Sequence, residues 1–169
     1  MSVRWVSRRR HAARAAWLVA ALLAAPAVQA AIDCNVSTTG VNFGAYDPTS
    51  ATPDDIAGNL AVTCTRVIFV DVFHVPFTVA LSRGSSTSFS PRTLRSGTNV
   101  LNYNIYRDAG HAQVWGDGTS STGTLSDSSD FVWFQTSQTD NYTLYGRIPT
   151  LQDVRVGTYA DTIVLQITF

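Results

Sequence analysis

The final stretch of the chain, residues 159–169, has the sequence YADTIVLQITF. Apolar side chains recur there at every second position, which is the period of a β-strand with one buried face. The apolar set on one face consists of Ile163, Leu165, Ile167 and Phe169. The other face carries Thr162, Gln166 and Thr168, with Val164 among them. The stretch therefore predicts a strand from Tyr159 to Phe169.

This expected strand is unusual because it runs to the last residue and ends on an aromatic side chain. Most domains leave a frayed polar tail at an end unless that end is tied down. One interpretation is an ordinary terminal strand. The other is that a strand from a second polypeptide pairs beside it and completes the sheet by β-augmentation. The pattern alone leaves both interpretations open.

Upstream of this stretch, short strand patterns alternate with turn residues, and no segment has a convincing helical period. The expected strands are residues 36–43, 59–65, 77–81, 100–106, 131–134 and 142–148. The mostly apolar run 67–75 could be a further, buried strand, which Pro76 interrupts. Residues 82–90 and 119–130 are rich in Ser, Thr, Gly and Asp and predict exposed loops. This pattern predicts an all-β fold, an immunoglobulin-like β-sandwich.

Composition also favours β structure. The chain has twelve acidic residues, all of them aspartate, and it contains no lysine. Asp, Ser, Thr, Gly and Asn favour turns and strand surfaces, whereas Glu and Lys favour helices. Residues 31–169 hold seven arginines against twelve aspartates, a net charge of −5. Such a surface argues against nucleic acid and anionic membranes as partners, because both require clustered basic side chains.

The first thirty residues have the three-part layout of a secretory signal peptide. The basic cluster is Arg4, Arg8, Arg9, Arg10 and Arg14. The apolar run 15–25 that follows is too short to span a bilayer as a helix, which takes about 20 residues. We expect cleavage between Ala30 and Ala31, by the general secretion route. The mature protein is then one domain, residues 31–169, without a transmembrane segment, that passes through the periplasm to the cell surface.

Cys34 and Cys64 are the two cysteines of the chain. In an oxidising compartment they are expected to pair, and the disulfide would close a loop of about thirty residues. The competing interpretation is a pair of metal-binding thiols. It lacks the close Cys or His spacing that zinc sites use.

The sequence offers little catalytic chemistry, so we predict no enzyme, no cofactor and no metal. A hydrolase needs a nucleophile, a base and an orienting group in one cleft. His74 and His111 are the candidate bases; His74 is expected to be a packed or edge residue and His111 a solvated one. His111, Asp108 and Asp117 could bind a metal, but their spacing is not that of a fixed ligand set. Paired aspartates for sugar cleavage are not excluded by spacing, although turn chemistry explains them better.

Trp115 and Trp133 could form a carbohydrate-binding platform together with the tyrosines. The alternative is that both rings fill the core of the sandwich. The sequence favours the core, because aromatic side chains gain most from burial.

Several segments together resemble the spore coat protein U family, whose domain is also used by pilins of the archaic chaperone–usher pathway. The similar segments are residues 41–46 (VNFGAY), 62–65 (VTCT), 101–108 (LNYNIYRD), 114–118 (VWGDG), 145–149 (YGRIP) and 157–162 (GTYADT). They occur in the family's order and span nearly all of residues 31–169. The sequence differs from the family in its longer apolar run 67–75 and in the segment 119–130.

The resemblance implies an incomplete sandwich, whose last strand is lent first by a periplasmic chaperone and then by a neighbouring pilus subunit at an outer-membrane usher. It also implies the Cys34–Cys64 disulfide between the first two strands. By match with the family, the docking residues would lie on the terminal strand: Tyr159, Ile163, Leu165, Ile167 and Phe169. Cleavage after Ala30 would leave three residues before Cys34. That is too short for a donor strand, so the subunit is expected at a fibre tip.

Three functions follow as hypotheses. The first is a structural or adhesive subunit of a surface fibre that is assembled by donor-strand exchange. The second is a self-contained secreted spore-coat or matrix protein with the same domain. The third, and least supported, is an extracellular hydrolase.

Overall fold

The computed structural model describes residues 32–67 and 73–169, and in this part of the chain it contains strands, turns and loops but no helix. The strands are β1 (Ile32–Thr38), β2 (Asp54–Arg66), β3 (His74–Leu81), β4 (Arg92–Ser96), β5 (Asn99–Tyr106), β6 (Leu125–Asp130), β7 (Ser137–Ile148) and β8 (Leu165–Thr168). The expected signal peptide lies outside the described residues, as do residues 68–72 of the apolar run. Within the described ranges, no helix has the length and hydropathy that a membrane crossing requires.

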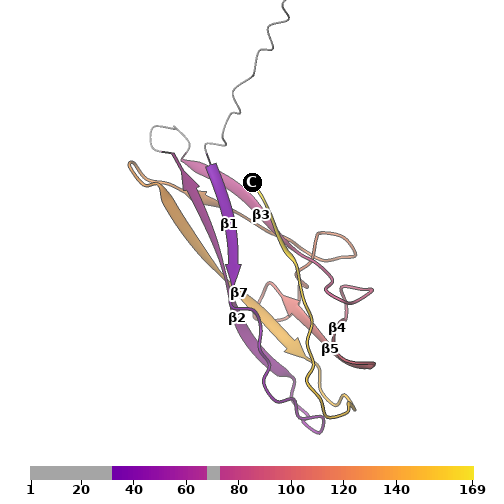
Figure 1. Cartoon of the computed structure of the whole chain (residues 1–169). Coiled ribbons are helices and arrows are strands. Elements are labelled where there is room, and N and C mark those ends of the chain that lie inside the picture. Colours follow the sequence, from indigo (N-terminus) through magenta and orange to yellow (C-terminus); the bar gives the residue numbers. More distant parts are fainter. Residues whose placement is uncertain (1–31, 68–72) are drawn as a thin grey trace, which may run out of the picture.

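The strands form two antiparallel sheets. One sheet has the strand order β1-β2-β7-β5-β4, and the other has the order β6-β3-β8. Figure 1 shows the yellow C-terminal segment running along the length of the molecule, toward the end at which β1 begins. The expected all-β fold with an immunoglobulin-like sandwich architecture is confirmed.

Strands β2 and β7 form the long central pair of the larger sheet, with a register from Asp54 opposite Ile148 to Thr65 opposite Ser137. Strand β1 pairs with the second half of β2, and Cys34 lies directly opposite Cys64. The two cysteines form the expected disulfide. It joins the edge strand β1 to the centre of its sheet.

The core lies between the sheets and follows the period-two pattern of the sequence. The buried side chains of β2 and β3 are Leu60, Val62, Cys64, Val75, Phe77, Val79 and Leu81. Leu101, Tyr103 and Ile105 of β5 belong to the same cluster, and they lie in the larger sheet together with β2, facing β3 of the smaller sheet. The alternation of apolar and polar residues in β2, β3 and β5 therefore predicts which face of each strand is buried, because successive side chains of a strand point to opposite faces.

Strand β4 was not expected from the sequence, and it contributes the fully buried Arg92. Its guanidinium donates to the Asn104 side-chain carbonyl and to the Trp115 carbonyl, both at 2.7 Å. It also donates to the Ser82 carbonyl through Nε and Nη2. Arg92 thus links β4 and β5 of the larger sheet to the segment that follows β3. Burial lowers the pKa of Arg92 from its usual value.

Several expected element bounds were wrong. The first strand is Ile32–Thr38 and not 36–43, because the chain turns at Gly40, which has a φ of +69°. Residues 125–130, expected as loop, form β6 against β3. Residues 131–134, expected as a strand, are outside any strand; Phe131 is buried and residues 132–134 form an exposed turn. The terminal strand is shorter than predicted, because regular pairing with β3 covers Leu165–Thr168 alone.

Pro76 does not interrupt β3, which runs through it from His74 to Leu81. Among the described strands, β8 pairs with β3 only from Thr78 onward, so Pro76 is paired on one side alone, with Ser128 of β6. A proline is tolerated at such a position because its missing N–H leaves no gap in a ladder.

Candidate docking groove

The terminal segment, residues 159–169, is attached along one side to its neighbours. Strand β8 pairs with β3. Just before β8, the Val164 N–H donates to the Ser82 hydroxyl and the Val164 carbonyl accepts from the Ser82 N–H, both at 2.9 Å. Ala160 forms an isolated antiparallel bridge with Arg95 of β4. The attachments hold the segment in place between the two sheets.

Asp161 attaches the terminal segment between the bridge at Ala160 and the hydrogen bonds of Val164. Its carboxylate accepts hydrogen bonds from the Ser85 N–H and hydroxyl, both at 2.8 Å, and from the Tyr103 hydroxyl at 2.7 Å. Burial raises the pKa of Asp161, but these hydrogen bonds outweigh burial, so the pKa is lowered overall. Burial and the neighbouring carboxylate raise the pKa of Tyr103. The pair is therefore an ionised carboxylate and a neutral phenol at neutral pH.

The opposite rim begins where β1 ends. The Thr38 hydroxyl donates to the Asn59 carbonyl at 2.8 Å and accepts from the Gly40 N–H at 2.9 Å. Gly40 lies in the left-handed region, with a φ of +69°. This turn takes residues 41–46 away from β2 and across the inner face of the larger sheet.

Two glycines of the larger sheet allow this close crossing. A Cβ on Gly58 of β2 would overlap the Gly40 carbonyl. A Cβ on Gly146 of β7 would overlap the side chains of Val41 and Phe43. The absence of side chains at both glycines lets the segment pack directly on the backbone of the sheet.

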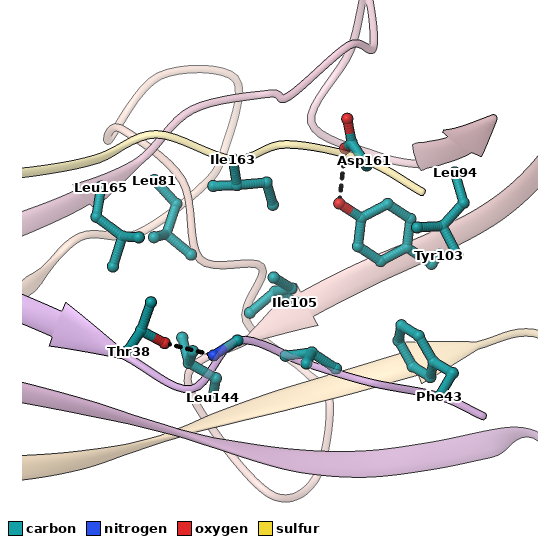
Figure 2. Close-up of a pocket in the computed structure, with 12 residues that line it drawn as sticks. Thr38, Phe43, Leu81, Leu94, Tyr103, Ile105, Leu144, Asp161, Ile163 and Leu165 are labelled. Atoms are coloured by element: carbon teal, nitrogen blue, oxygen red, sulfur yellow. Dashed lines mark hydrogen bonds between the residues drawn. The ribbon is translucent and has the colours of Figure 1, made fainter. Parts of the chain in front are cut away.

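A cavity of about 210 Å³ lies between the two rims. Figure 2 shows Ile163 and Leu165 of the terminal segment on one side and Thr38 and Phe43 on the other. Ile105 lies between them and Leu144 lies beside Thr38, and both belong to the larger sheet (Figure 2). The lining is mostly aliphatic and aromatic, so the cavity is suited to apolar side chains.

The cavity continues into a larger hollow of about 640 Å³ along the same rims. The two spaces share Val41, Phe43, Leu94 and Asp161 in their linings. Tyr46 closes the far part, since its hydroxyl accepts from the Gln152 N–H at 2.9 Å and donates to the Pro149 carbonyl at 3.1 Å. We call the combined space the groove.

The groove lies between two sheet edges. Among the described residues, β8 pairs with β3 alone and β1 pairs with β2 alone. An extended segment placed in the groove would find backbone groups on the outer side of β8 and apolar side chains beneath it. This is the arrangement that β-augmentation uses, with main-chain hydrogen bonds along an edge and pockets for alternate side chains.

The docking residues predicted from the sequence lie along this groove to different degrees. Ile163 and Leu165 line the cavity, and Tyr159 lines the larger hollow. Ile167 is half-buried in β8, opposite Val79, and Phe169 follows β8 with 53 % of its surface exposed. Tyr159, Ile163 and Leu165 therefore line the groove. Ile167 and Phe169 lie farther along the terminal segment, beyond the groove.

Sequence reasoning missed the opposite rim and the floor. Val41 and Phe43 had been placed on a first strand, and Leu94 belongs to a strand that was not expected. The sequence feature that could have indicated the end of the strand is the pair Gly40 and Gly44, because glycine readily adopts a positive φ. In the structure both have a φ of about +70°, which interrupts a strand through this segment.

The candidate acid–base residues do not gather into a cleft. His74 is exposed and its Nδ1 lies 2.7 Å from Asp130 Oδ1. His111, expected to be solvated, is instead packed edge-on between the rings of Tyr106 and Tyr145. In the described part of the chain, no group of three His, Cys, Asp or Glu side chains is arranged to hold a metal ion.

The two tryptophans have opposite environments. Trp115 is buried in the core, where its indole N–H donates to the Val79 carbonyl at 3.0 Å. Trp133 has 72 % of its surface exposed, so the expectation that it also fills the core was wrong. The two rings therefore form no common platform.

Comparison with known proteins agrees with the family resemblance. A family model described as Spore Coat Protein U domain matches residues 18–166. Protein U of Myxococcus xanthus is 32 % identical over 136 residues, covering 76 % of this chain and 71 % of its own length.

Among solved structures, one that matches this chain is the CsuC–CsuE chaperone–tip adhesion subunit pre-assembly complex from archaic chaperone–usher Csu pili of Acinetobacter baumannii. The sequence identity is 23 % and the TM-score is 0.49. The match covers 82 % of this chain but 40 % of that one, so this chain spans less than half of its length.

Proposed function

Since the chain belongs to the Spore Coat Protein U domain family, we propose that it is an exported subunit of a surface fibre that receives a strand from another polypeptide. A periplasmic chaperone would lend the strand first, and a neighbouring subunit would replace it at an outer-membrane usher. The resemblance found in the sequence implies this donor-strand exchange. Whether the subunit stands at the tip of a fibre stays a prediction, as does its adhesive role.

The observation that carries the proposal is the groove between residues 38–46 and the terminal segment. Its apolar lining comes from both sheets, and it lies beside a strand edge that is open among the described residues. Apolar side chains from a donor would fill the space that the core leaves open. Burial of each large aliphatic side chain would contribute about 1.5–3 kcal/mol.

The groove also limits which segment can dock. A donor must be extended and must carry apolar residues at alternate positions, because alternate side chains of a strand point to the same face. One of these should be large, to fill the cavity lined by Ile105, Leu144 and Ile163. A donor segment of about nine residues would extend roughly 30 Å.

The second candidate function is a self-contained coat or matrix protein. It is favoured by the description of the matching family, Spore Coat Protein U domain. In that case the groove would remain part of a complete, monomeric domain and would need no donor.

Titration with donor peptides tests the proposal. The full chain, exported and purified, is mixed with peptides of ten to twelve residues whose apolar side chains alternate, and its melting temperature is recorded. We expect at least one such peptide to raise the melting temperature further as its concentration increases, since a ligand that binds only the folded state stabilises it.

Matched variants locate the binding site. Ile163→Ser changes a wall of the cavity and should abolish the peptide effect. Val164→Ser changes the neighbouring side chain, which is 64 % exposed, and should leave the effect intact. A monomer that unfolds in one transition and is stabilised by no alternating peptide would contradict the proposal and favour the coat-protein alternative.

A further inference from the structure

A turn at one end of the sandwich presents three large apolar side chains to solvent. Val132, Trp133 and Phe134 have 69 %, 72 % and 81 % of their surfaces exposed. The turn, residues 131–136, connects β6 to β7. Isolated exposed apolar residues are common on proteins, but three consecutive ones on one turn form a patch that marks an interaction surface.

Arg66 and the aromatic rings around it contact this turn from several directions. The Arg66 guanidinium lies over the rings of Phe73 and Phe131, 4.7 Å and 5.0 Å from their centroids. The Trp133 ring packs edge-on against Phe73, with 5.0 Å between centroids, and Phe134 lies next to Trp133. Cation–π and edge-to-face contacts of this kind are favourable. This series of contacts therefore connects the buried Phe131, through Arg66 and Phe73, to the exposed rings of Trp133 and Phe134.

The polar backbone groups at the two ends of the turn are satisfied from the inside. Arg66 donates through Nη2 to the Val132 carbonyl and through Nε to the Gln135 carbonyl, both at 2.8 Å. The Val132 N–H donates to the Gln135 side-chain carbonyl at 3.0 Å. These bonds pair backbone groups at both ends of the turn, and its exposed side carries the side chains of Val132, Trp133 and Phe134. Moving it into an apolar phase would leave these backbone groups paired.

Phe134 adds an independent observation. Its φ is +64°, in the left-handed region, where a bulky residue is strained and glycine or asparagine is favoured. Local backbone geometry therefore does not explain a phenylalanine at this position. Such strain persists where the surrounding structure imposes it, and it is often found at functional sites.

The charge of the molecule restricts the partner. The chain from residue 31 onward has a net charge of −5, and the exposed Asp130 lies directly before the turn. An anionic membrane would be repelled. Tryptophan and phenylalanine are favoured at the boundary between lipid headgroups and acyl chains.

We infer that the 131–136 turn is a docking surface for the interface of a lipid bilayer with zwitterionic headgroups. The inference is independent of the groove. Ile32 of β1 pairs with Arg66, beside the turn, whereas Thr38 pairs with Leu60 and marks the start of the groove. The two sites therefore lie toward opposite ends of β1, and a failure at one does not imply a failure at the other.

Flotation with phosphatidylcholine vesicles tests the inference on the full chain as exported, alone or in complex with a strand donor. Phe134→Asn should lower the partition coefficient by about tenfold, as expected for the loss of one large buried side chain. Asparagine suits the left-handed backbone, so this variant should fold. Leu151→Ser is the matched control, because Leu151 is 64 % exposed and follows the opposite end of β7.

Fluorescence provides the second measurement. Subtracting the spectrum of Trp133→Ser from that of the unchanged protein isolates the emission of Trp133. We expect this emission to shift to shorter wavelength on addition of phosphatidylcholine vesicles and to be quenched by brominated acyl chains.

Three outcomes would overturn the inference. The first is equal flotation of the unchanged protein and Phe134→Asn. The second is adsorption to polystyrene beads without binding to vesicles, which would identify an apolar solid as the occupant. The third is a concentration-dependent blue shift without vesicles, which would identify a second copy of the chain.

Discussion

Arg92 stabilises the sandwich through the three acceptors that surround it. Its side chain is fully buried and donates to carbonyl oxygens of Ser82, Asn104 and Trp115. Buried carbonyl groups without a partner cost about 1–3 kcal/mol each. Arg92 therefore stabilises the fold mainly by donating hydrogen bonds to these carbonyl groups, and less through its charge.

Arg92→Met should lower the free energy of unfolding by about 3 kcal/mol or more, because several buried acceptors lose their donor together. Urea denaturation followed by circular dichroism measures the change. Arg95→Met on the same strand is the control, since its exposed side chain should contribute less than about 0.5 kcal/mol. A loss at position 92 no larger than that of the control would contradict the assignment.

Asp161 makes the attachment of the terminal segment sensitive to acid. Its pKa is lowered in the folded state by hydrogen bonds from Ser85 and Tyr103, against the opposing effect of burial. The stabilisation is therefore fully present above the pKa of an unfolded aspartate, about 3.9, and is lost as the pH falls through the lower folded value.

Asp161→Asn should reduce stability at pH 7 and should flatten the decline in the free energy of unfolding between about pH 5 and pH 2. Denaturation curves at several pH values measure both effects. Asp153→Asn replaces an exposed aspartate and serves as the control. An Asp161→Asn variant with an unchanged pH profile would show that the carboxylate is not the relevant acid.

At the scale of elements, the disulfide fixes the edge strand β1, whose last residue, Thr38, begins one rim of the groove. Strand β1 pairs with β2 alone among the described strands, and Cys34 is joined to Cys64 across this pairing. The residues are separated by 30 positions in sequence. Constraint of a loop of this length in the unfolded chain stabilises the fold by roughly 3–4 kcal/mol.

Cys34→Ser/Cys64→Ser should therefore lower the free energy of unfolding by about 3–4 kcal/mol. Mass spectrometry of the alkylated, unreduced protein should show no free thiol in the unchanged chain. Reductant should destabilise the unchanged protein to the level of the double variant and should not affect the variant itself. Alkylation of both cysteines without reductant would disprove the disulfide in solution.

At the scale of the whole molecule, both sheets contribute to the groove. Leu81 and Leu165 come from the smaller sheet, and Ile105 and Leu144 come from the larger one. Filling this space with a donor strand would extend the core of the sandwich. The proposed chaperone would thus act on folding as well as on assembly, because it would supply missing apolar contacts.

Leu165→Asp should abolish capture by a periplasmic chaperone and lead to degradation, because a buried carboxylate without a partner is strongly destabilising. Immunoblots of the periplasm, with and without chaperone co-expression, measure the amount of protein. Val164→Asp is the matched control, since Val164 points away from the cavity and is 64 % exposed. The milder Leu165→Ala separates loss of capture from loss of folding. Normal amounts of secreted Leu165→Asp protein would refute the docking role.

The sequence alone determined what depends on local alternation and on composition. Buried faces of β2, β3 and β5 followed from period-two patterns, and the half-buried Ile163, Leu165 and Ile167 followed from the same rule. The disulfide could be predicted because Cys34 and Cys64 are the two cysteines of a chain expected to be exported. These features could be predicted because a strand exposes its two faces in strict alternation, whatever lies next to it.

Only the tertiary structure decided which segments became neighbours. The polar residues 125–130 form a strand because β3 offers them an edge, and the apolar residues 132–134 stay exposed because Arg66 holds them in a turn. The groove likewise joins residues 38–46 to residues 154–165. Contacts between such distant segments depend on long-range pairing, so no local pattern in either segment contains them.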